Sequence, residues 1–333
     1  MKYVLPSLVI LTLASLSVFG VADDRKLHQG NRNRIVRVVT ITQAELQRES
    51  DNLLEETMAR LEQAASFQPD IACLPELFLN RPPEPVPGPV TDRLAAWARQ
   101  HASYVVFGVK TKTGNRVYNA AVLIDRVGQI CGKYSKIHPT EGELAEGTVP
   151  GGLDPPVFET DFGTIGIQIC FDINWWDVWK RLKQQGAKIV FFPSAYPAAR
   201  QLSALALMNQ YYVVSSAMRG SSKIYDISGE VLASSVNYQQ WAGAALPIGK
   251  RLFEIDFHAQ KARQIQQKYG SKVDVVWFHD DDWFTLASVD PDLTVEDIIS
   301  EFDLTPLNDY RVRATKAIDK ARADAAAQVN LGK

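Results

Sequence analysis

The sequence predicts a layered α/β domain with mixed β-sheets, followed by a helical C-terminal extension. Through residues 35–233, segments with helical periodicity alternate with short apolar runs typical of buried strands. Some of these strands follow one another across tight turns, as antiparallel hairpins do, whereas others are separated by a helix, as parallel neighbours are. A chain with both kinds of connection is expected to build mixed sheets covered by helices.

The predicted strands are short runs rich in β-branched and aromatic residues, with turn-forming residues near their ends. They cover residues 35–42, 70–74, 104–109, 118–124, 129–134, 164–169, 189–192, 211–216, 223–226 and 231–233. Two pairs of consecutive strands form hairpins, one across residues 125–128 and the other around Ser228 and Gly229.

Apolar residues spaced three and four apart predict the helices. Thr42 and Glu45 have the spacing of a capping box and precede the first helix, whose apolar face runs from Leu46 to Ala65. The other helices of the domain cover residues 91–101, 178–185 and 201–210. After Asp290 the strands give way to amphipathic or alanine-rich helices over residues 295–302 and 311–329. We interpret these as an extension that packs on the domain or on a partner subunit, with a mobile tail as the alternative for the last residues.

Residues 1–22 have the three parts of a secretory signal peptide. Lys2 supplies a positive charge, an apolar run follows over residues 3–19, and small residues occupy the −3 and −1 positions at Gly20 and Ala22. Polar residues interrupt the apolar run, which disfavours a retained membrane anchor. We therefore expect cleavage after Ala22, no stable membrane insertion afterwards, and a secreted or periplasmic protein. The catalytic domain is expected over residues 23–289 and the helical extension over residues 290–333.

Charge and cysteine content exclude several classes of function. Without Lys2, 35 Lys and Arg residues face 38 Asp and Glu residues, with no basic stripe, so we expect no nucleic-acid partner. The chain has three cysteines, Cys73, Cys131 and Cys170, and an odd number leaves at least one free thiol in an exported protein, while a Cys73–Cys131 disulfide stays open. No CxxC pair or Cys–His cluster indicates a zinc site, and we interpret the run of three aspartates after His279 as a solvated loop.

Three polar residues stand at or just after the ends of apolar strands: Glu76, Lys136 and Cys170. A cysteine thiol, whose ordinary pKa is about 8.5, is a weak nucleophile at neutral pH, and a neighbouring ammonium group favours its thiolate. A carboxylate can accept and return the proton, and the ammonium group can also stabilise an oxyanion. The three residue types together are therefore typical of nucleophilic catalysis by cysteine.

The order and setting of these residues resemble the nitrilase, or carbon–nitrogen hydrolase, superfamily. The resemblance covers about residues 34–257 and includes the flanking motifs Pro87-Gly88-Pro89, Tyr118-Asn119, Cys170-Phe171-Asp172, Pro193-Ser194-Ala195 and the turn from Asp226 to Gly229. It implies a four-layer αββα sandwich that usually pairs with a second subunit. We therefore expect a homodimer or a higher homo-oligomer.

Carried over by position, the resemblance also implies the roles of the site residues. Cys170 would be the nucleophile, Glu76 the general base and acid, and Lys136 the group that stabilises the tetrahedral intermediate. The backbone N–H of Phe171 would be the second oxyanion donor. No metal ion and no organic cofactor is implied.

Members of the superfamily often carry a further glutamate shortly after the lysine, where it positions the substrate. Glu143 has the spacing seen in several branches, and Glu141 and Glu146 are the alternatives. His138 is expected to brace the loop that carries the lysine.

The residues after Cys170 favour an amidase. True nitrilases commonly place Trp-Glu-Asn there, where this chain has Phe171-Asp172-Ile173, and the arginines with which D-amino-acid carbamoylases hold a carboxylate are absent. The Cys-Phe-Asp-Ile run, with Asp177, instead resembles the secreted pantetheinase and biotinidase branch. We therefore predict a hydrolase that cleaves a non-peptide amide of a small molecule through a cysteine thioester.

Three alternatives stay open or are disfavoured by the sequence. A nitrile-hydrolysing or carbamoyl-hydrolysing member of the same superfamily stays open, as does a catalytically inactive secreted binding protein on the same scaffold. A papain-like protease would pair Cys170 with His258 or His279, but the sequence lacks the Gly-Ser-Cys-Trp-like setting of that nucleophile.

We predict that the mature protein starts at or near Asp23, because small residues at Gly20 and Ala22 close the apolar run. N-terminal sequencing of protein recovered from the periplasm or the culture fluid tests this. An intact Met1 on protein found only in membranes would support an uncleaved anchor instead.

Overall fold

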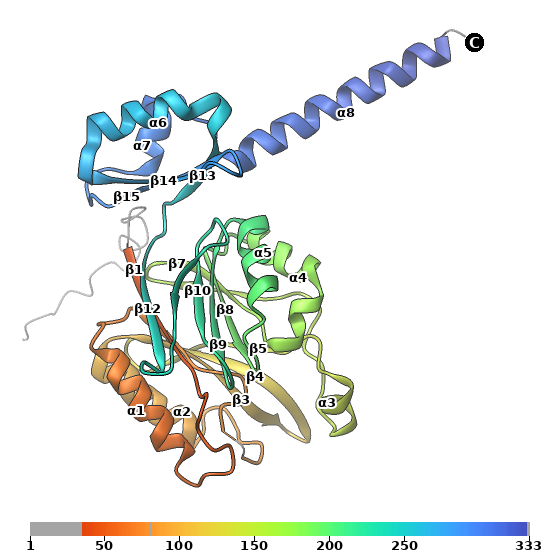
Figure 1. Ribbon diagram of the computed structural model, residues 1–333. Helices are drawn as coiled ribbons and strands as arrows, with labels where there is room; N and C mark the ends of the chain where they lie inside the picture. Colours follow the sequence, from red (N-terminus) through yellow and green to blue (C-terminus); the bar gives the residue numbers. More distant parts are fainter. Residues whose placement is uncertain (1–34, 80, 332–333) are drawn as a thin grey trace, which may run out of the picture. The chain divides into compact units, whose positions relative to one another are not determined.

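Two six-stranded β-sheets pack face to face, and a pair of helices covers the outer side of each sheet (Figure 1). The computed structural model describes residues 35–79 and 81–331, so the predicted signal peptide over residues 1–22 lies outside the described residues. The arrangement confirms the four-layer αββα sandwich that the sequence predicted.

The first sheet has the strand order β12-β1-β2-β3-β4-β5. Its strands are β12 (Trp241–Pro247), β1 (Ile35–Ile41), β2 (Ile71–Cys73), β3 (Tyr104–Thr113), β4 (Arg116–Ile124) and β5 (Ile130–Ser135). Strands β1, β2 and β3 are parallel, and the remaining pairings are antiparallel, so the sheet is mixed. Helices α1 (Leu53–Ala65) and α2 (Pro89–His101) cover its outer face.

The second sheet has the order β11-β10-β9-β8-β7-β6. Its strands are β11 (Val231–Ser234), β10 (Lys223–Tyr225), β9 (Tyr212–Ala217), β8 (Ile189–Ser194), β7 (Gly163–Ile167) and β6 (Val157–Thr160). Strands β7, β8 and β9 are parallel, so their carboxyl ends meet at one edge of the sheet. Helices α4 (Trp176–Gln184) and α5 (Ala199–Asn209) cover the outer face.

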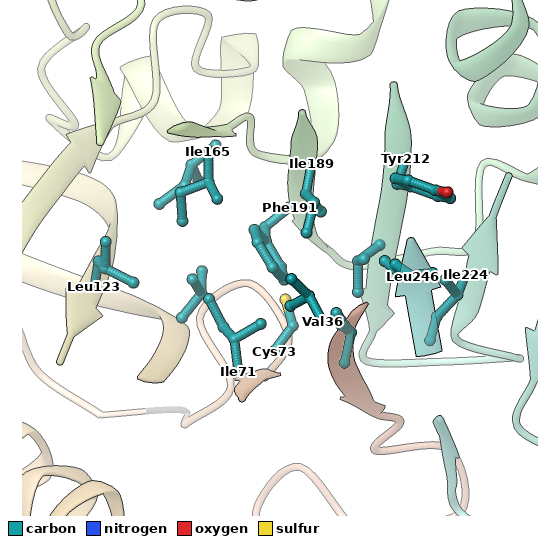
Figure 2. Close-up of a cluster of buried hydrophobic side chains, with 14 of the residues drawn as sticks. Val36, Ile71, Cys73, Leu123, Ile165, Ile189, Phe191, Tyr212, Ile224 and Leu246 are labelled. Atoms are coloured by element: carbon teal, nitrogen blue, oxygen red, sulfur yellow. The ribbon is translucent and has the colours of Figure 1, made fainter. Parts of the chain in front are cut away.

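The main core lies between the two sheets and is built by the period-2 alternation of their strands. Figure 2 shows side chains of this core, among them Val36 and Ile71 from the first sheet and Ile189 and Phe191 from the second. Cys73 is fully buried in the same cluster. All three cysteines are free, so the structure contains no Cys73–Cys131 disulfide.

A third, three-stranded sheet follows the sandwich. It has the order β13-β15-β14 and consists of β13 (Arg251–Glu254), β15 (Trp283–Ser288) and β14 (Val273–Phe278). Helices α6 (Ile255–Tyr269) and α7 (Val295–Glu301) bury apolar side chains against it, while η3 (Gly270–Lys272) precedes β14. The predicted start of the extension, residue 290, falls between β15 and α7, whose side chains share one core.

The last helix, α8 (Leu307–Leu331), packs at its beginning, where Leu307 and Tyr310 contact the inter-sheet core. The side chains of residues 315–326 are exposed. No helix among the described residues has the length and apolar character needed to cross a membrane.

The predicted start of the first helix is wrong. Residues 44–52 form turns, and α1 begins at Leu53. The Thr42 hydroxyl donates to the Gly220 carbonyl at 2.7 Å and accepts from the Ala44 N–H at 3.1 Å, in a local turn and not in a helix cap. Glu45 has a φ of 71°, which is incompatible with an α-helix.

Candidate active site

Three strand ends bring Glu76, Lys136 and Cys170 together. Glu76 follows β2, Lys136 directly follows β5, and Cys170 follows β7, so the two sheets both contribute. The Lys136 Nζ donates to Glu76 Oε1 at 2.8 Å, and both charges act on the Cys170 thiol. Lys136 is 2% exposed, Glu76 4% and Cys170 9%, which places a cluster of titratable groups almost entirely out of water.

The loop that carries Glu76 is held against β3 by close backbone contact. The Gly108 N–H donates to the Pro75 carbonyl at 3.1 Å. A Cβ atom on Gly108 would lie 2.5 Å from the Glu76 Cα, a distance that real Cβ atoms do not show. Glycine at this position therefore allows the approach that fixes the backbone of Glu76.

The Cys170 backbone is strained. Its φ of 44° lies in the left-handed region, which non-glycine residues rarely adopt. The residue starts the short 3₁₀-helix η2 (Cys170–Asn174), whose first internal hydrogen bond runs from the Asp172 N–H to the Ile169 carbonyl. The Phe171 N–H precedes that first bonded donor, which leaves it without an acceptor inside the helix, as an oxyanion donor requires.

The thiol of Cys170 is protonated at neutral pH. Burial and the neighbouring Glu76 carboxylate raise its pKa to about 12, against smaller opposing effects of Lys136, the Ala195 N–H and the Ser194 hydroxyl. The last two groups lie at the end of β8 and contact the thiol. A thiol in this state needs a base that removes its proton before it can attack.

Asp172 joins the segment of Lys136 to the turn of Cys170. Its fully buried carboxylate accepts hydrogen bonds from the Tyr134 hydroxyl at 2.7 Å and from the His138 N–H at 2.8 Å, on either side of Lys136. The His138 ring also lies 3.0 Å from Asp172 and stacks on Trp175 with a centroid distance of 3.8 Å. These contacts agree with the expected bracing role of His138.

Of the glutamates that follow Lys136 in the sequence, Glu143 is the one whose side chain contacts Lys136 in the structure. It lies in the short helix α3 (Glu141–Ala145), and its Oε2 accepts from the Lys136 Nζ at 2.7 Å and from the Thr140 N–H at 2.8 Å. Glu141 is exposed, and Glu146 pairs with Lys110 at 3.3 Å. Of the three alternatives, only Glu143 contacts Lys136.

The Lys136–Glu76–Glu143 contacts also set the charge states. Burial would lower the pKa of Lys136, but the attraction of Glu76 and the hydrogen bonds of both carboxylates outweigh it and raise that pKa. Burial would raise the pKa of Glu143, but hydrogen bonds from Lys136, Asn119 and Thr140 lower it. At neutral pH the ammonium group is therefore charged and Glu143 is a carboxylate.

Asn119 is a site residue whose role the sequence did not reveal. It lies in the interior of β4, and its Nδ2 donates to Glu76 Oε1 at 2.7 Å and to Glu143 Oε1 at 2.6 Å. One feature of the sequence could have indicated this role: Asn119 is a polar residue among the apolar residues of a predicted buried strand. A buried amide of this kind must find hydrogen-bond partners inside the fold.

The described residues contain no group of three or more His, Cys, Asp and Glu side chains placed to hold a metal ion. His258, a partner that a papain-like mechanism would need, lies in α6, where its Nε2 accepts from the Thr305 N–H at 3.2 Å. The neighbours of Cys170 are instead a carboxylate and an ammonium group.

Comparisons with known proteins agree with this geometry. Residues 36–242, more than half of the chain, match the family model for carbon-nitrogen hydrolases. A deaminated glutathione amidase of Mus musculus is 31% identical over 191 residues, which cover 48% of this chain and 59% of that protein. A bifunctional nitrilase/nitrile hydratase of Lupinus angustifolius is 28% identical over 41% of this chain and 47% of that protein. The chain thus spans about half the length of these curated relatives.

Solved structures show the same fold at low sequence identity. An amidase from Nesterenkonia sp. AN1 has a TM-score of 0.57 and 16% identity, over 72% of this chain and 98% of that chain. That structure shows covalent addition of the acetamide moiety of fluoroacetamide at the active site cysteine. The C. elegans NitFhit protein has a TM-score of 0.56 and 20% identity, over 71% of this chain and 65% of that chain.

We predict that inactivation by iodoacetamide follows alkylation of Cys170, which has a carboxylate within reach of its proton. The residue Cys131 is exposed, but partial burial of its thiol and the charge of Asp125 raise the pKa of that thiol to about 11. Peptide mass mapping during the loss of activity gives the measurement, and a Cys131→Ser variant should be inactivated at the wild-type rate. Full activity after complete labelling of Cys170 would refute the assignment.

Proposed function

The chain belongs to the carbon–nitrogen hydrolase family, and we propose that it hydrolyses a non-peptide amide of a small molecule through a thioester on Cys170. The observation that carries this proposal is the buried contact of Lys136 with Glu76 beside the thiol of Cys170. A base and a cation around one nucleophile supply what acyl transfer from an amide requires.

Acylation begins with proton transfer from the Cys170 thiol to Glu76. The sulfur then attacks the amide carbonyl carbon, and the carbonyl oxygen becomes an oxyanion held by Lys136 and the Phe171 N–H. When the tetrahedral intermediate collapses, the carbon–nitrogen bond breaks and Glu76 returns its proton to the leaving nitrogen. Ammonia or an amine departs, and the acyl group remains on sulfur.

Deacylation repeats the same steps with water. Glu76 accepts a proton from a water molecule that attacks the thioester, and the same two donors hold the second oxyanion. The carbon–sulfur bond breaks, the carboxylic acid leaves, and the proton returns from Glu76 to Cys170. The balance is amide plus water to acid plus ammonia or amine, without a net change in the protein.

Two curated relatives and one similar solved structure support an amide as the substrate class. The curated relatives include deaminated glutathione amidases of Mus musculus and Synechocystis, and the similar solved structures include an amidase with a modified active site cysteine. Export after cleavage at Ala22 and assembly into a homodimer or higher homo-oligomer are further parts of the proposal, supported by the sequence of residues 1–22 and by the resemblance to the superfamily.

The experiment that tests the function is a uniform screen of amides, carbamoyl compounds and nitriles with the mature protein. Ammonia release reports turnover, and intact-mass measurement of quenched reactions reports an acyl adduct on Cys170. Turnover should be lost in Cys170→Ala, whereas Cys131→Ser should remain active. Binding of a small molecule without turnover or adduct, in a folded wild-type protein, would support the inactive binding protein.

We predict that the enzyme prefers amides to nitriles. An amide has a carbonyl oxygen to which Lys136 can donate and an N–H that can donate a hydrogen bond to the Glu143 carboxylate. A nitrile has neither group. The expected gap is at least ~10-fold in kcat/KM, which corresponds to about 1.4 kcal/mol of transition-state stabilisation. Matched amide and nitrile pairs with the same acyl group give the comparison. Faster turnover of the nitrile in most pairs would move the protein to the nitrilase branch.

We predict that Glu143→Gln is badly impaired but still forms a covalent adduct. The substitution removes a charged partner of Lys136 and an acceptor for the substrate, which costs roughly 2–4 kcal/mol of transition-state binding. Single-turnover adduct formation and steady-state kinetics separate the two effects. Glu141→Gln and Glu146→Gln are matched controls on the same segment. If one of these variants is inactive while Glu143→Gln is active, the substrate-positioning role belongs to that residue and not to Glu143.

A further inference from the structure

We propose that Asn119 is a positioning residue that directs one defined oxygen of Glu76 toward the thiol of Cys170. The proposal rests on the proposed function, because it concerns the base of that reaction. Asn119 donates to the two glutamates and acts through them.

A single amide group bridges both carboxylates. The Asn119 Nδ2 donates to Glu76 Oε1 at 2.7 Å and to Glu143 Oε1 at 2.6 Å. Lys136 bridges the same two side chains from its Nζ, at 2.8 Å and 2.7 Å. The two carboxylates are therefore joined twice, once by a cation and once by a neutral donor group, and the four side chains form a closed ring.

The orientation of the amide follows from chemistry. If its oxygen and nitrogen were exchanged, the amide oxygen would face two carboxylate oxygens at hydrogen-bond distance, with no proton between them. With the nitrogen toward the carboxylates, the Asn119 Oδ1 is buried and has no hydrogen-bond partner among the described residues. A buried acceptor without a partner destabilises the fold. The fold tolerates this cost while both amide hydrogens serve the glutamates.

The ring assigns different tasks to the two oxygens of Glu76. Oε1 accepts from both Lys136 and Asn119, so its lone pairs are engaged. Oε2 is left as the oxygen that accepts the proton of Cys170 and later returns it to the leaving nitrogen. Without Asn119 the Glu76 carboxylate could rotate about its Cγ–Cδ bond while keeping the contact with Lys136. Oε2 would then no longer be held toward the Cys170 thiol.

The ring combines two carboxylates with one cation and one neutral donor. Asn119 is that neutral donor, and its hydrogen bond is one of those that lower the pKa of Glu143. The other charged or titratable groups that act on this cluster are Lys136, Arg48 and Tyr196. Hydrogen bonds to a carboxylate favour its charged form, so the loss of the two Asn119 hydrogen bonds is expected to appear on the acid side of the pH profile.

The test compares Asn119→Leu and Asn119→Asp with the wild-type protein. Leucine has the same number and branching of side-chain heavy atoms and no donor, whereas aspartate keeps the shape and adds a negative charge. Alkylation of Cys170 by iodoacetamide in a Cys131→Ser background, measured against pH, needs no knowledge of the natural substrate. The fastest amide of the screen then gives kcat and KM over the same pH range.

We expect the acid limb of both profiles to move up by about one pH unit in Asn119→Leu and further in Asn119→Asp. The kcat of Asn119→Leu should fall by roughly 10- to 100-fold with KM within about threefold of the wild-type value. Asp226→Asn is the matched control, because it breaks a buried 3.0 Å contact with Lys250 elsewhere in the sandwich. It should lower thermal stability without moving either limb.

Unchanged acid limbs and kcat in both folded Asn119 variants would overturn the proposal. So would a loss of activity that only follows the loss of stability, as in the Asp226→Asn control. Two further outcomes are distinct from this one. Absence of amide turnover by the wild-type protein in the screen would be a failure of the proposed function. If Glu76→Gln instead keeps full turnover and its acid limb, Glu76 is not the base, and both the mechanism proposed above and this inference are wrong.

Discussion

The contact between one buried ammonium group and two buried carboxylates is the constraint on which the site depends. Lys136 is almost fully buried, and removing a charge from water costs several kcal/mol unless partners compensate it. Glu76 and Glu143 supply that compensation, but they leave the cluster with one excess negative charge. Each further feature of the site, from the Asn119 amide to the protonation state of Cys170, follows from this excess charge.

The excess negative charge decides how the nucleophile can work. A thiolate beside two carboxylates would be a second uncompensated anion, so the proton stays on Cys170 until a substrate is attacked. This differs from a cysteine whose pKa is lowered by a cationic imidazole, because the thiol here depends on transfer to a fixed carboxylate at the moment of reaction. Proton transfer from sulfur to Glu76 moves the negative charge without changing its total, and Lys136 stays positive throughout. The cation therefore remains available to the developing oxyanion.

The sequence predicted those parts of the site that stand at strand ends. Glu76, Lys136 and Cys170 each interrupt an apolar pattern, and the chemistry of the three residue types is complementary. Asn119 lies inside a strand, and its hydrogen-bond partners come from other segments of the chain, so no local sequence pattern predicts them. Strand β12 was missed for a related reason: its alanine-rich sequence is a weak strand signal, and it forms by antiparallel pairing with β1, about 200 residues away along the chain. The capping-box spacing at Thr42 failed because its hydroxyl accepts from the Ala44 N–H in a turn, and Glu45 has a left-handed φ that an α-helix does not allow.

The sandwich and the site are joined through one buried carboxylate. Cys170 lies at the end of a strand of the second sheet, while Lys136 follows a strand of the first, so their separation depends on how the sheets are placed. The Asp172 carboxylate holds the two segments together. It accepts from the Ile169 N–H, next to Cys170, and from the Tyr134 hydroxyl and the His138 N–H on either side of Lys136. A shift of one sheet against the other would strain these bonds and change the distance from lysine to thiol together. The packing of the inter-sheet core and the geometry of the reaction centre are therefore set by the same contacts, which explains why a strained φ at Cys170 persists in this fold.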